Sequence, residues 1–221
     1  MYLFFDTETS GLPKNYNAPI SDLDNWPRIV QIAWLEQDKH GNDISTGNYY
    51  VTPDGFEISE DSQKIHRISK EKATDLGYPI TNVLEVFNAI ISKSKYIIAH
   101  NIDFDYKVLS SEFARIYMKS DIESKTKICT MQETVEFCNL PGSSGLKYPK
   151  LAELYYKLFA KNFDNAHDAQ ADIEATAECF WSLKQRGIID TEQLKTKQVI
   201  GADKPAEVEE KPSDDGNISM F

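Results

Sequence analysis

Short apolar runs and amphipathic stretches alternate along the first two hundred residues of the chain. Runs of apolar, β-branched and aromatic residues predict three early strands, at residues 2–6, 29–37 and 48–52. Two more runs, at 96–100 and 127–130, are separated by stretches with apolar residues at helical spacing. Three strands followed by alternating strands and helices predict an α/β fold, with a mixed sheet of about five strands flanked by helices.

Helices are expected between and after these strands. Residues 59–76 are expected to be helical in pieces, and Thr81 is expected to cap a helix that ends near residue 92. Another helix should follow residue 100, and two more should span about 150–160 and 168–186. The last of these is expected to end at Gly187.

Two segments lack such periodicity. Residues 13–27 are rich in Pro, Asn and Asp, and this loop is long for a compact domain, which favours a functional use. Residues 201–221 carry six acids and two lysines and are expected to form a disordered acidic tail. The chain is therefore divided into a domain at 1–200 and a tail at 201–221.

Composition narrows the class of protein. The 221 residues are 41% hydrophobic, which is enough for a core, and no apolar run reaches the roughly 18 residues of a membrane span. The start of the chain shows no signal peptide, and three widely spaced cysteines without a CxxC pair suggest reduced thiols, so the cytoplasm is the expected compartment. The net charge of −11 argues against non-specific coating of nucleic acid.

Acidic residues gather at the ends of two expected strands. Asp6 and Glu8 lie two apart, so strand geometry places both side chains on one face of the sheet, where two like charges are costly without a cation. Asp103 and Asp105 follow the run at 96–100, at the kind of strand end where α/β sheets build sites. Asp103 is expected to be a helix N-cap, which leaves Asp105 for the site. Taken alone, Asp6 and Glu8 could also be a turn acid and a surface acid.

A third acidic group begins the last helix. Asp168 and Asp172 are i,i+4 neighbours flanked by small residues, and His167 lies just before the helix. An acidic, solvent-facing helix start is the plainer reading, since it suits the helix dipole. Taken together, the three groups offer hard oxygen ligands without cysteine, which favours Mg²⁺ or Mn²⁺ over zinc. Carboxylates from several elements suit a two-metal phosphoryl-transfer site, and a histidine suits its general base.

The same residues lie in three motifs that resemble those of the DEDD exonuclease superfamily, in its histidine-bearing DEDDh branch. That branch includes the proofreading (epsilon) subunit of bacterial DNA polymerase III. The matching segments, in the family's order, are FDTETSGL at 5–12, AHNIDFDYKVL at 99–109 and AHDAQADIEAT at 166–176. The resemblance implies a ribonuclease H-like fold and hydrolysis from a 3′ end to nucleoside 5′-monophosphates, with two Mg²⁺ or Mn²⁺ ions.

The resemblance also implies a role for each site residue. Asp6 would bridge both metals, Glu8 and Asp172 would serve the metal on the nucleophile side, and Asp105 the other. His167 would be the base. The residues implied to contact the terminal nucleotide are Thr7, Thr9, Leu12 and Phe104, with His66 and Asn101 as weaker candidates.

Histidine positions outside the motifs are less informative. The IHRIS segment at 65–69 resembles the family's HGI segment, but Arg67 stands in place of the usual glycine. His66 and Asn101 are equally well explained as a helix-cap histidine and a turn asparagine. His40 is expected at the surface, and His100 is expected to be structural.

The last five residues resemble the pentapeptide that binds the bacterial sliding clamp. They are Asn217, Ile218, Ser219, Met220 and Phe221. A disordered leash with an apolar tip can dock in a groove and tether a domain over a long reach. The resemblance implies a single-stranded nucleic acid 3′ end, preferably DNA, as substrate and a sliding clamp or DNA polymerase III as partner. An exoribonuclease like oligoribonuclease and RNase T, or an inactive clamp-tethered adaptor, are the alternatives.

Overall fold

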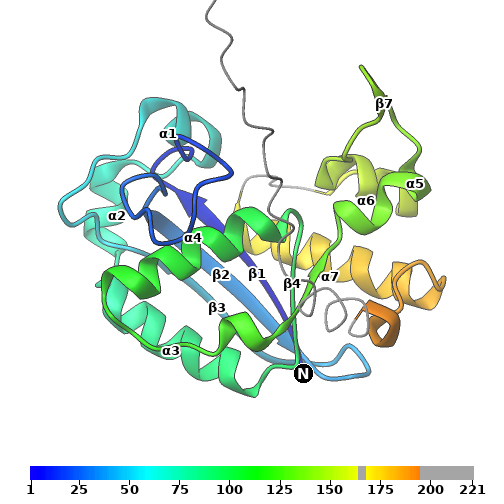
Figure 1. The fold of residues 1–221 in the computed structure, drawn as a ribbon, viewed down its shortest axis with the longest axis horizontal. Coiled ribbons are helices and arrows are strands. Elements are labelled where there is room, and N and C mark those ends of the chain that lie inside the picture. Colours follow the sequence, from blue (N-terminus) through cyan, green and yellow to red (C-terminus); the bar gives the residue numbers. More distant parts are fainter. Residues whose placement is uncertain (164–167, 195–221) are drawn as a thin grey trace, which may run out of the picture.

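A computed structural model describes residues 1–163 and 168–194 (Figure 1). Five strands form its main sheet: β1 (Tyr2–Thr9), β2 (Ile29–Gln37), β3 (Asp43–Tyr50), β4 (Tyr96–Ala99) and β5 (Thr126–Cys129). Their order is β3-β2-β1-β4-β5. The first three strands pair antiparallel, whereas β1 with β4 and β4 with β5 pair parallel. The expected mixed five-strand sheet is confirmed, although the third strand begins earlier than residue 48.

Helices connect the strands and follow them. They are α1 (Glu60–His66), α2 (Lys70–Leu76), α3 (Ile80–Lys93), α4 (Ile102–Arg115), α5 (Val135–Cys138), α6 (Leu151–Phe159) and α7 (Ala169–Gln185). Short 3-10 turns occur at η1 (Ile122–Ser124) and η2 (Gln132–Thr134), and a small hairpin at β6 (Pro141–Gly142) and β7 (Gly145–Leu146). No helix in the described ranges is long and apolar enough to cross a membrane.

Two helix starts differ from the expectation. Pro79, not Thr81, is the N-cap of α3, because the helix already begins at Ile80. At α4 the N-cap is Asn101, in the left-handed conformation, and Asp103 lies inside the first turn. Neither residue makes a side-chain cap hydrogen bond. Proline has a φ that suits a helix start, and asparagine tolerates positive φ, so backbone geometry sets where both helices begin.

The sheet separates two apolar cores. On one face, Tyr2 and Phe4 of β1 pack with Ile173 and Phe180 of α7 and with α6. On the other, Leu3 of β1 packs beneath α3 and α4 in a second core. Figure 1 shows α3 and α4 in front of the sheet and α7 behind it. Even-numbered positions of β1 therefore point towards α7, and odd-numbered positions towards α4.

Residues 10–28, between β1 and β2, form a long loop that is fastened to α4. Arg115 donates to the carbonyl oxygens of Leu23 and Trp26, both at 2.6 Å. Glu112, which is 1% exposed, accepts from the Arg28 side chain at 2.7 Å and pairs with Arg115 at 3.0 Å. The loop is thus an ordered part of the domain, held by a buried ionic cluster.

The three cysteines agree with the expectation of reduced thiols. Cys129, Cys138 and Cys179 are all buried and free. Burial raises the pKa of each thiol, so all three are protonated near neutral pH. They act as small apolar residues of the cores.

Candidate active site

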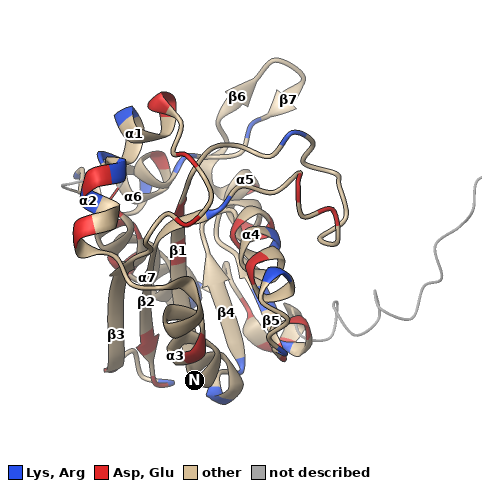
Figure 2. Cartoon of the chain, turned by 90° about the vertical axis from the view of Figure 1, so that its left-hand side faces the viewer, with Lys and Arg blue, Asp and Glu red and all other residues tan. Residues whose placement is uncertain are grey.

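Asp6, Glu8 and Asp172 come together at one end of the sheet. One carboxylate oxygen of each lies within 4.8 Å of the others. Asp6 and Glu8 are even-numbered positions of β1, and Asp172 lies in the first turn of α7, which covers that face. The two-residue period of the strand and the docking of α7 therefore bring together acids that are far apart in the sequence. Figure 2 shows acidic positions on β1.

Asp105 reaches the same region from the other face. It is 3% exposed and lies in the first turn of α4, directly after β4. Its Oδ1 accepts from the Thr7 backbone N–H at 3.0 Å and from the Thr7 hydroxyl at 2.7 Å. Because β4 runs parallel to β1, the end of β4 delivers α4 to the end of β1 that carries Asp6 and Glu8.

The acids perturb one another. Burial, followed by repulsion from Asp105 and Glu8, raises the pKa of Asp6 well above its usual range. Burial and the charge of Asp172 raise the pKa of Glu8 to about 8. Burial also raises the pKa of Asp105 to about 7, although the hydrogen bonds from Thr7 oppose the shift. Such a set favours either protons or a cation between the carboxylates.

Asp168 adds a fifth negative charge beside the cluster. It is the N-cap of α7 and accepts from the backbone N–H of Gln170 at 3.1 Å and of Ala171 at 3.3 Å. Its charge contributes to the raised pKa values of Asp6 and Glu8. The cap orients the start of α7, and with it Asp172.

Some expected residues fall outside the described ranges. His167, expected as general base, is one of them. The five residues of the expected clamp-binding peptide, Asn217 to Phe221, also lie outside.

The expected nucleotide contacts differ in accessibility. Leu12 is 74% exposed and Phe104 is half-buried, so both offer accessible apolar surface, and Phe104 is the neighbour of Asp105 in the chain. The hydroxyl of Thr7 is bonded to Asp105, and that of Thr9 donates to the Gly11 carbonyl at 2.7 Å. The side chains of these two threonines bond to the protein itself, and their contact with a nucleotide stays a prediction.

The two weaker candidates, His66 and Asn101, both lie at helix ends, and their contacts with a nucleotide stay a prediction. The ring Nδ1 of His66 accepts from the Ile68 N–H at 3.0 Å, which closes the end of α1. Burial lowers the pKa of His66, and the neighbouring Thr9 backbone partly opposes this shift. Asn101 begins α4 with a φ of 86° and lines a pocket together with Phe104.

The remaining histidines and Asp103 are placed outside the cluster. His100 bridges the Thr130 hydroxyl and the Pro149 carbonyl, each at 3.0 Å, and burial lowers its pKa to about 4. This confirms a structural role. His40 is exposed, as expected. Asp103 accepts from Gln132 at 2.9 Å and is not the N-cap that the sequence suggested.

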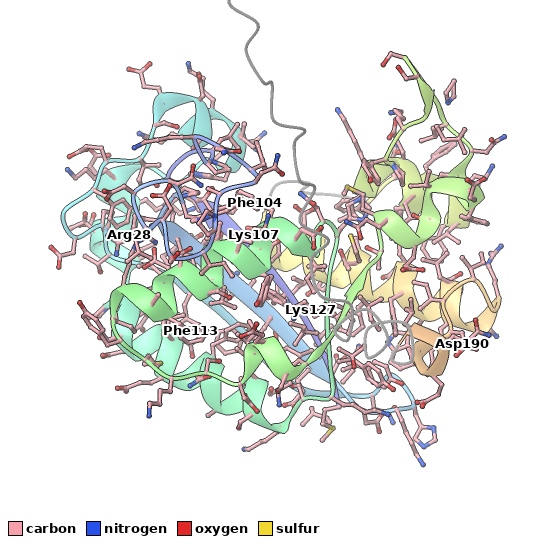
Figure 3. All side chains as sticks on the ribbon, viewed as in Figure 1. Arg28, Phe104, Lys107, Phe113, Lys127 and Asp190 are labelled. Carbon is pink, nitrogen blue, oxygen red and sulfur yellow. The ribbon has the colours of Figure 1, made fainter. Side chains whose placement is uncertain are left out.

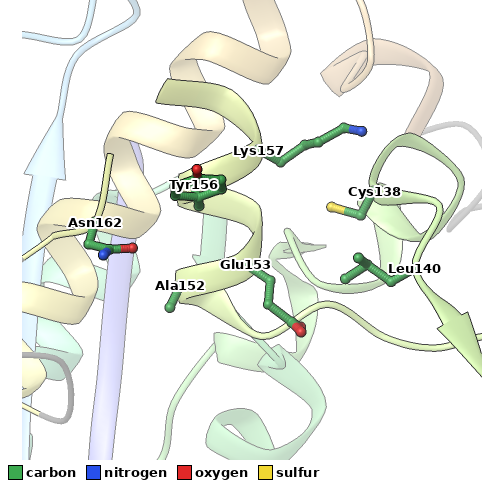
Figure 4. Close-up of a pocket in the computed structure, with 7 residues that line it drawn as sticks. All are labelled: Cys138, Leu140, Ala152, Glu153, Tyr156, Lys157 and Asn162. Atoms are coloured by element: carbon green, nitrogen blue, oxygen red, sulfur yellow. The ribbon is translucent and has the colours of Figure 1, made fainter. Parts of the chain in front are cut away.

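A separate hollow lies against α6, with a volume of about 410 Å³ (Figure 4). Its lining comes from residues 138–162 and includes Tyr156, Lys157 and Cys138. Its one acid, Glu153, is already engaged, since it accepts from Lys147 at 2.5 Å and from the Lys150 N–H at 2.8 Å. The hollow contains none of the expected site residues.

The cluster fits divalent cations. Its ligand atoms are carboxylate oxygens, which Mg²⁺ and Mn²⁺ prefer, and the burial and mutual repulsion that raise the pKa of Asp6 and Glu8 are effects that a bound cation would offset. The class of protein follows from this arrangement, in which acids come from a central strand of a mixed sheet and from helices on both of its faces. This is the ribonuclease H-like fold with a carboxylate site of the kind that binds metal ions.

Family comparison agrees with this class. The family model described as Exonuclease (RNase_T) matches residues 3–180, so the chain belongs to this exonuclease family. Together with the fold, this supports the DEDD-type 3′–5′ exonuclease superfamily. Likeness to the epsilon subunit in particular remains an expectation. No curated protein sequence matches the chain.

Solved structures share the fold. E. coli Exonuclease I in complex with a dA16 oligonucleotide is 20% identical with a TM-score of 0.67, over 90% of this chain and 43% of that one. The zinc-bound E. coli Exonuclease I complex with single-stranded DNA is 22% identical with a TM-score of 0.66, over 90% and 42%. A complex of Exonuclease I with SSB-Ct is 19% identical with a TM-score of 0.66, over 90% and 43%. The chain thus matches less than half the length of these proteins.

Sequence reasoning missed two features of the site. One is the support of Asp105 by Thr7, which the alternation of β1 could have indicated, because an odd-numbered polar residue in this strand faces α4. The other is which residues of the loop, itself expected to be functional, share a pocket with Phe104. The available signal was the presence of two aromatic residues, Tyr16 and Trp26, among the Pro and Asn residues of that loop.

Proposed function

We propose that this chain is a metal-dependent exonuclease that hydrolyses single-stranded DNA from its 3′ end to nucleoside 5′-monophosphates. The observation that carries the proposal is the convergence of Asp6, Glu8 and Asp172 within 4.8 Å, on a chain of the exonuclease family. Asp105, held by Thr7, completes a set of four acids. In the DEDD superfamily, such acids are the ligands of two divalent ions.

Each acid has a place in this mechanism. Asp6 would be shared between two ions, with Glu8 and Asp172 on one and Asp105 on the other. Ions held there supply charge that stabilises phosphoryl transfer and lowers the pKa of water. The carboxyl groups must be ionised to bind these metal ions. Because burial raises the pKa values of Asp6 and Asp105, their ionisation would be coupled to binding of the cation.

The remaining residues would bind substrate and move a proton. His167 would take the proton of the attacking water on a ring nitrogen, as its unperturbed pKa near 6.5 suits. Exposed Leu12 and half-buried Phe104 would pack against the terminal base or sugar. The backbone near Thr7 and Thr9, together with Asn101 and His66, would complete the contacts with the terminal nucleotide.

A labelled-substrate assay tests the activity and the choice of substrate. Single-stranded DNA and RNA, each labelled at the 5′ end, are incubated with the protein and Mg²⁺ or Mn²⁺. We expect 3′ shortening of DNA that is abolished by a chelator, by Asp6→Ala and by His167→Ala. Asp61→Ala, which removes a side chain that is 91% exposed, serves as the matched control.

The outcomes separate the alternatives. Shortening of RNA but not DNA would identify an exoribonuclease instead. Binding of either strand without shortening would point to an inactive adaptor. No effect of Asp6→Ala on an active preparation would contradict the proposed site.

A role in replication or repair rests on the last five residues. Their likeness to the clamp-binding peptide suggests that the tail docks on a bacterial sliding clamp, which would place the nuclease near DNA polymerase III. Exonuclease I, which shares the fold of this chain, has been solved in complex with a dA16 oligonucleotide and with SSB-Ct, and these complexes support a proposal of DNA as substrate. A pull-down on a sliding clamp with wild type, Phe221→Ala and the tail control Glu209→Ala tests this. Equal recovery of all three would reject docking.

A further inference from the structure

A pocket lies between the loop 10–28 and the start of α4. Its volume is about 260 Å³, slightly below the roughly 300–1,000 Å³ of sites for drug-sized ligands. It is therefore suited to a single base or nucleoside. Six of its ten lining residues are Tyr16, Trp26, Asn101, Phe104, Lys107 and Tyr148.

Four of these six residues are aromatic. Tyr16 is 53% exposed and Tyr148 is 59% exposed, while Trp26 is only 3% exposed. The buried tryptophan donates its ring N–H to the Pro19 carbonyl at 3.0 Å, which fixes the loop behind the pocket. Both tyrosines present open ring surface, as base stacking requires, and Tyr16 does so from the loop that Trp26 holds.

A lysine gives the pocket a positive charge at its rim. Lys107 donates to the Tyr16 carbonyl at 2.8 Å and lies 5.4 Å from the centre of the Trp26 ring. Figure 3 shows Lys107 and Phe104 on α4 beneath the blue loop of residues 10–28. The ammonium group can attract a phosphate of a strand that enters here.

The interior of the pocket suits a neutral base better than a phosphate. Asp103 also lines it, and its carboxylate would repel a phosphate. Amide groups of Asn17, Asn101 and Gln132 offer donors and acceptors for the edge of a base. Gln132 is oriented by its 2.9 Å bond to Asp103.

The pocket lies at the same end of the sheet as the carboxylates. Asn101 and Phe104 belong to the junction of β4 and α4, and Asp105 is the next residue of that helix turn. The parallel pairing of β4 with β1 places this junction beside the end of β1 that carries Asp6 and Glu8. One strand of nucleic acid can therefore reach both places.

We propose that this pocket is a second base-binding site, which receives a base of the single strand on the 5′ side of the terminal nucleotide. The inference rests on the proposed function, because an enzyme acting at a 3′ end has the rest of its strand only on the 5′ side. Tyr16 and Tyr148 stack on the base, and Lys107 contacts an adjacent phosphate. The loop 10–28 is thus a substrate-binding element.

Abasic substitution of the substrate tests the site directly. Single-stranded octanucleotides of DNA and of RNA carry one abasic position at successive steps from the 3′ end. For the wild type, one upstream abasic position should lower kcat/KM about tenfold or more, chiefly through KM. For the Tyr16→Ala/Tyr148→Ala double variant, kcat/KM on the intact strand should fall by a similar factor, and the abasic position should cost nothing further.

Tyr117→Ala/Tyr156→Ala is the matched control, since these tyrosines are 94% and 58% exposed and line no part of this pocket. The control should respond to abasic positions like the wild type. Equal responses of the double variant and the wild type at every position would overturn the inference.

A binding measurement tests the pocket independently of catalytic activity. Fluorescence anisotropy of a 5′-labelled octanucleotide is measured with all three proteins in an Asp6→Asn background. Weaker binding by the Tyr16→Ala/Tyr148→Ala protein alone would support the pocket, and equal binding by all three would overturn it. A wild type that shortens no strand would refute the proposed function, while this comparison would still decide the base-binding site.

Discussion

At the scale of single residues, the carboxylate cluster is expected to lower the free energy of unfolding of the metal-free protein. Asp105 is buried, Asp6 and Glu8 are partly buried, and the pKa values of all three are raised. Without a cation, the folded protein holds protons that the unfolded chain would release at the same pH. The site is therefore a local source of instability that a bound ion removes.

This predicts how the stability of the metal-free protein depends on pH. The pKa of Glu8 is about 8 in the folded state against 4.5 for the free side chain, so the free energy of unfolding should fall as pH rises between these values. Asp6→Asn removes one repelling charge, so its melting temperature should exceed that of the wild type near pH 8 in chelator. Added Mg²⁺ should raise the melting temperature of the wild type and not of the variant.

The difference between wild type and Asp6→Asn is the quantity to follow. His100 titrates in the opposite sense, since its pKa is lowered to about 4 and its contribution is lost as pH falls. That contribution is common to both proteins and cancels. A difference that does not grow with pH would contradict the repulsion argument.

Thr7 is predicted to position Asp105 for metal binding. Thr7→Val removes the hydroxyl that donates to Asp105 at 2.7 Å and keeps the shape of the side chain. Loss of such a supporting bond typically weakens metal affinity or activity about 10–100-fold. We expect a higher Mg²⁺ concentration for half-maximal activity in Thr7→Val, measured by titration. Thr7→Ser keeps the hydroxyl and should behave like the wild type, so equal titration curves for Val and Ser would contradict this role.

At the scale of elements, the backbone at the end of α1 explains why the HGI segment of the DEDDh exonucleases has a glycine where this chain has Arg67. Arg67 is the C-cap of this helix, with a φ of 59° and a ψ of 29°. This left-handed conformation costs a residue with a Cβ atom roughly 1–2 kcal/mol, and glycine almost nothing. The chain accepts an arginine where the backbone requires glycine geometry.

Arg67→Gly should therefore stabilise the protein. The relief is partly offset by the greater freedom of glycine in the unfolded chain, so we expect a gain of about 0.5–1 kcal/mol. Chemical denaturation measures it, with Arg67→Ala as the control that keeps the Cβ atom. A glycine variant less stable than the alanine variant would show that strain is absent here.

The loop 10–28 depends on one buried acid. Glu112 is 1% exposed and is bonded to Arg28, Arg115 and the Ile29 N–H. Glu112→Ala would leave two arginines without their partner, which for buried pairs costs about 3–5 kcal/mol. We expect a lower melting temperature and faster proteolysis within residues 13–27. The exposed pair of Lys64 and Asp61 provides the control, because Asp61→Ala should change stability by less than about 1 kcal/mol.

At the scale of the whole molecule, the sequence predicted the central strands of the sheet more accurately than the edge strand β3. Apolar runs identified β1, β2 and β4 because these strands are buried, whereas β3 has a mostly exposed first half and its polar start at Asp43 carried no apolar signal. The meeting of Asp6 with Asp172 could be inferred only through the family motifs. The spacing of apolar residues within a helix or strand does not indicate which helix covers which face of the sheet.

Helix caps and the supporting bonds were less predictable for a similar reason. Asp103 and Thr81 are good capping residues, but the caps are Asn101 and Pro79, because the preceding strand and turn set where each helix begins. The bond from Thr7 to Asp105 joins residues from different elements. Such contacts depend on tertiary packing and not on local preference.

The division at residue 200 predicts an independent catalytic domain. Truncation after residue 200 removes six acids and two lysines, and it leaves both described ranges intact. We expect an unchanged melting temperature and unchanged kcat/KM on short oligonucleotides. Loss of folding in the truncated protein would show that the tail belongs to the domain.

The distance along the chain between Asp6 and Asp172 bears on when the protein becomes active. The ribosome delivers β1 first, while α7 is the last helix of the described part. A nascent chain therefore displays Asp6 and Glu8 long before Asp172 can join them. The nascent chain should stay silent, close to messenger RNA and other strands, until α7 has emerged and docked on the sheet.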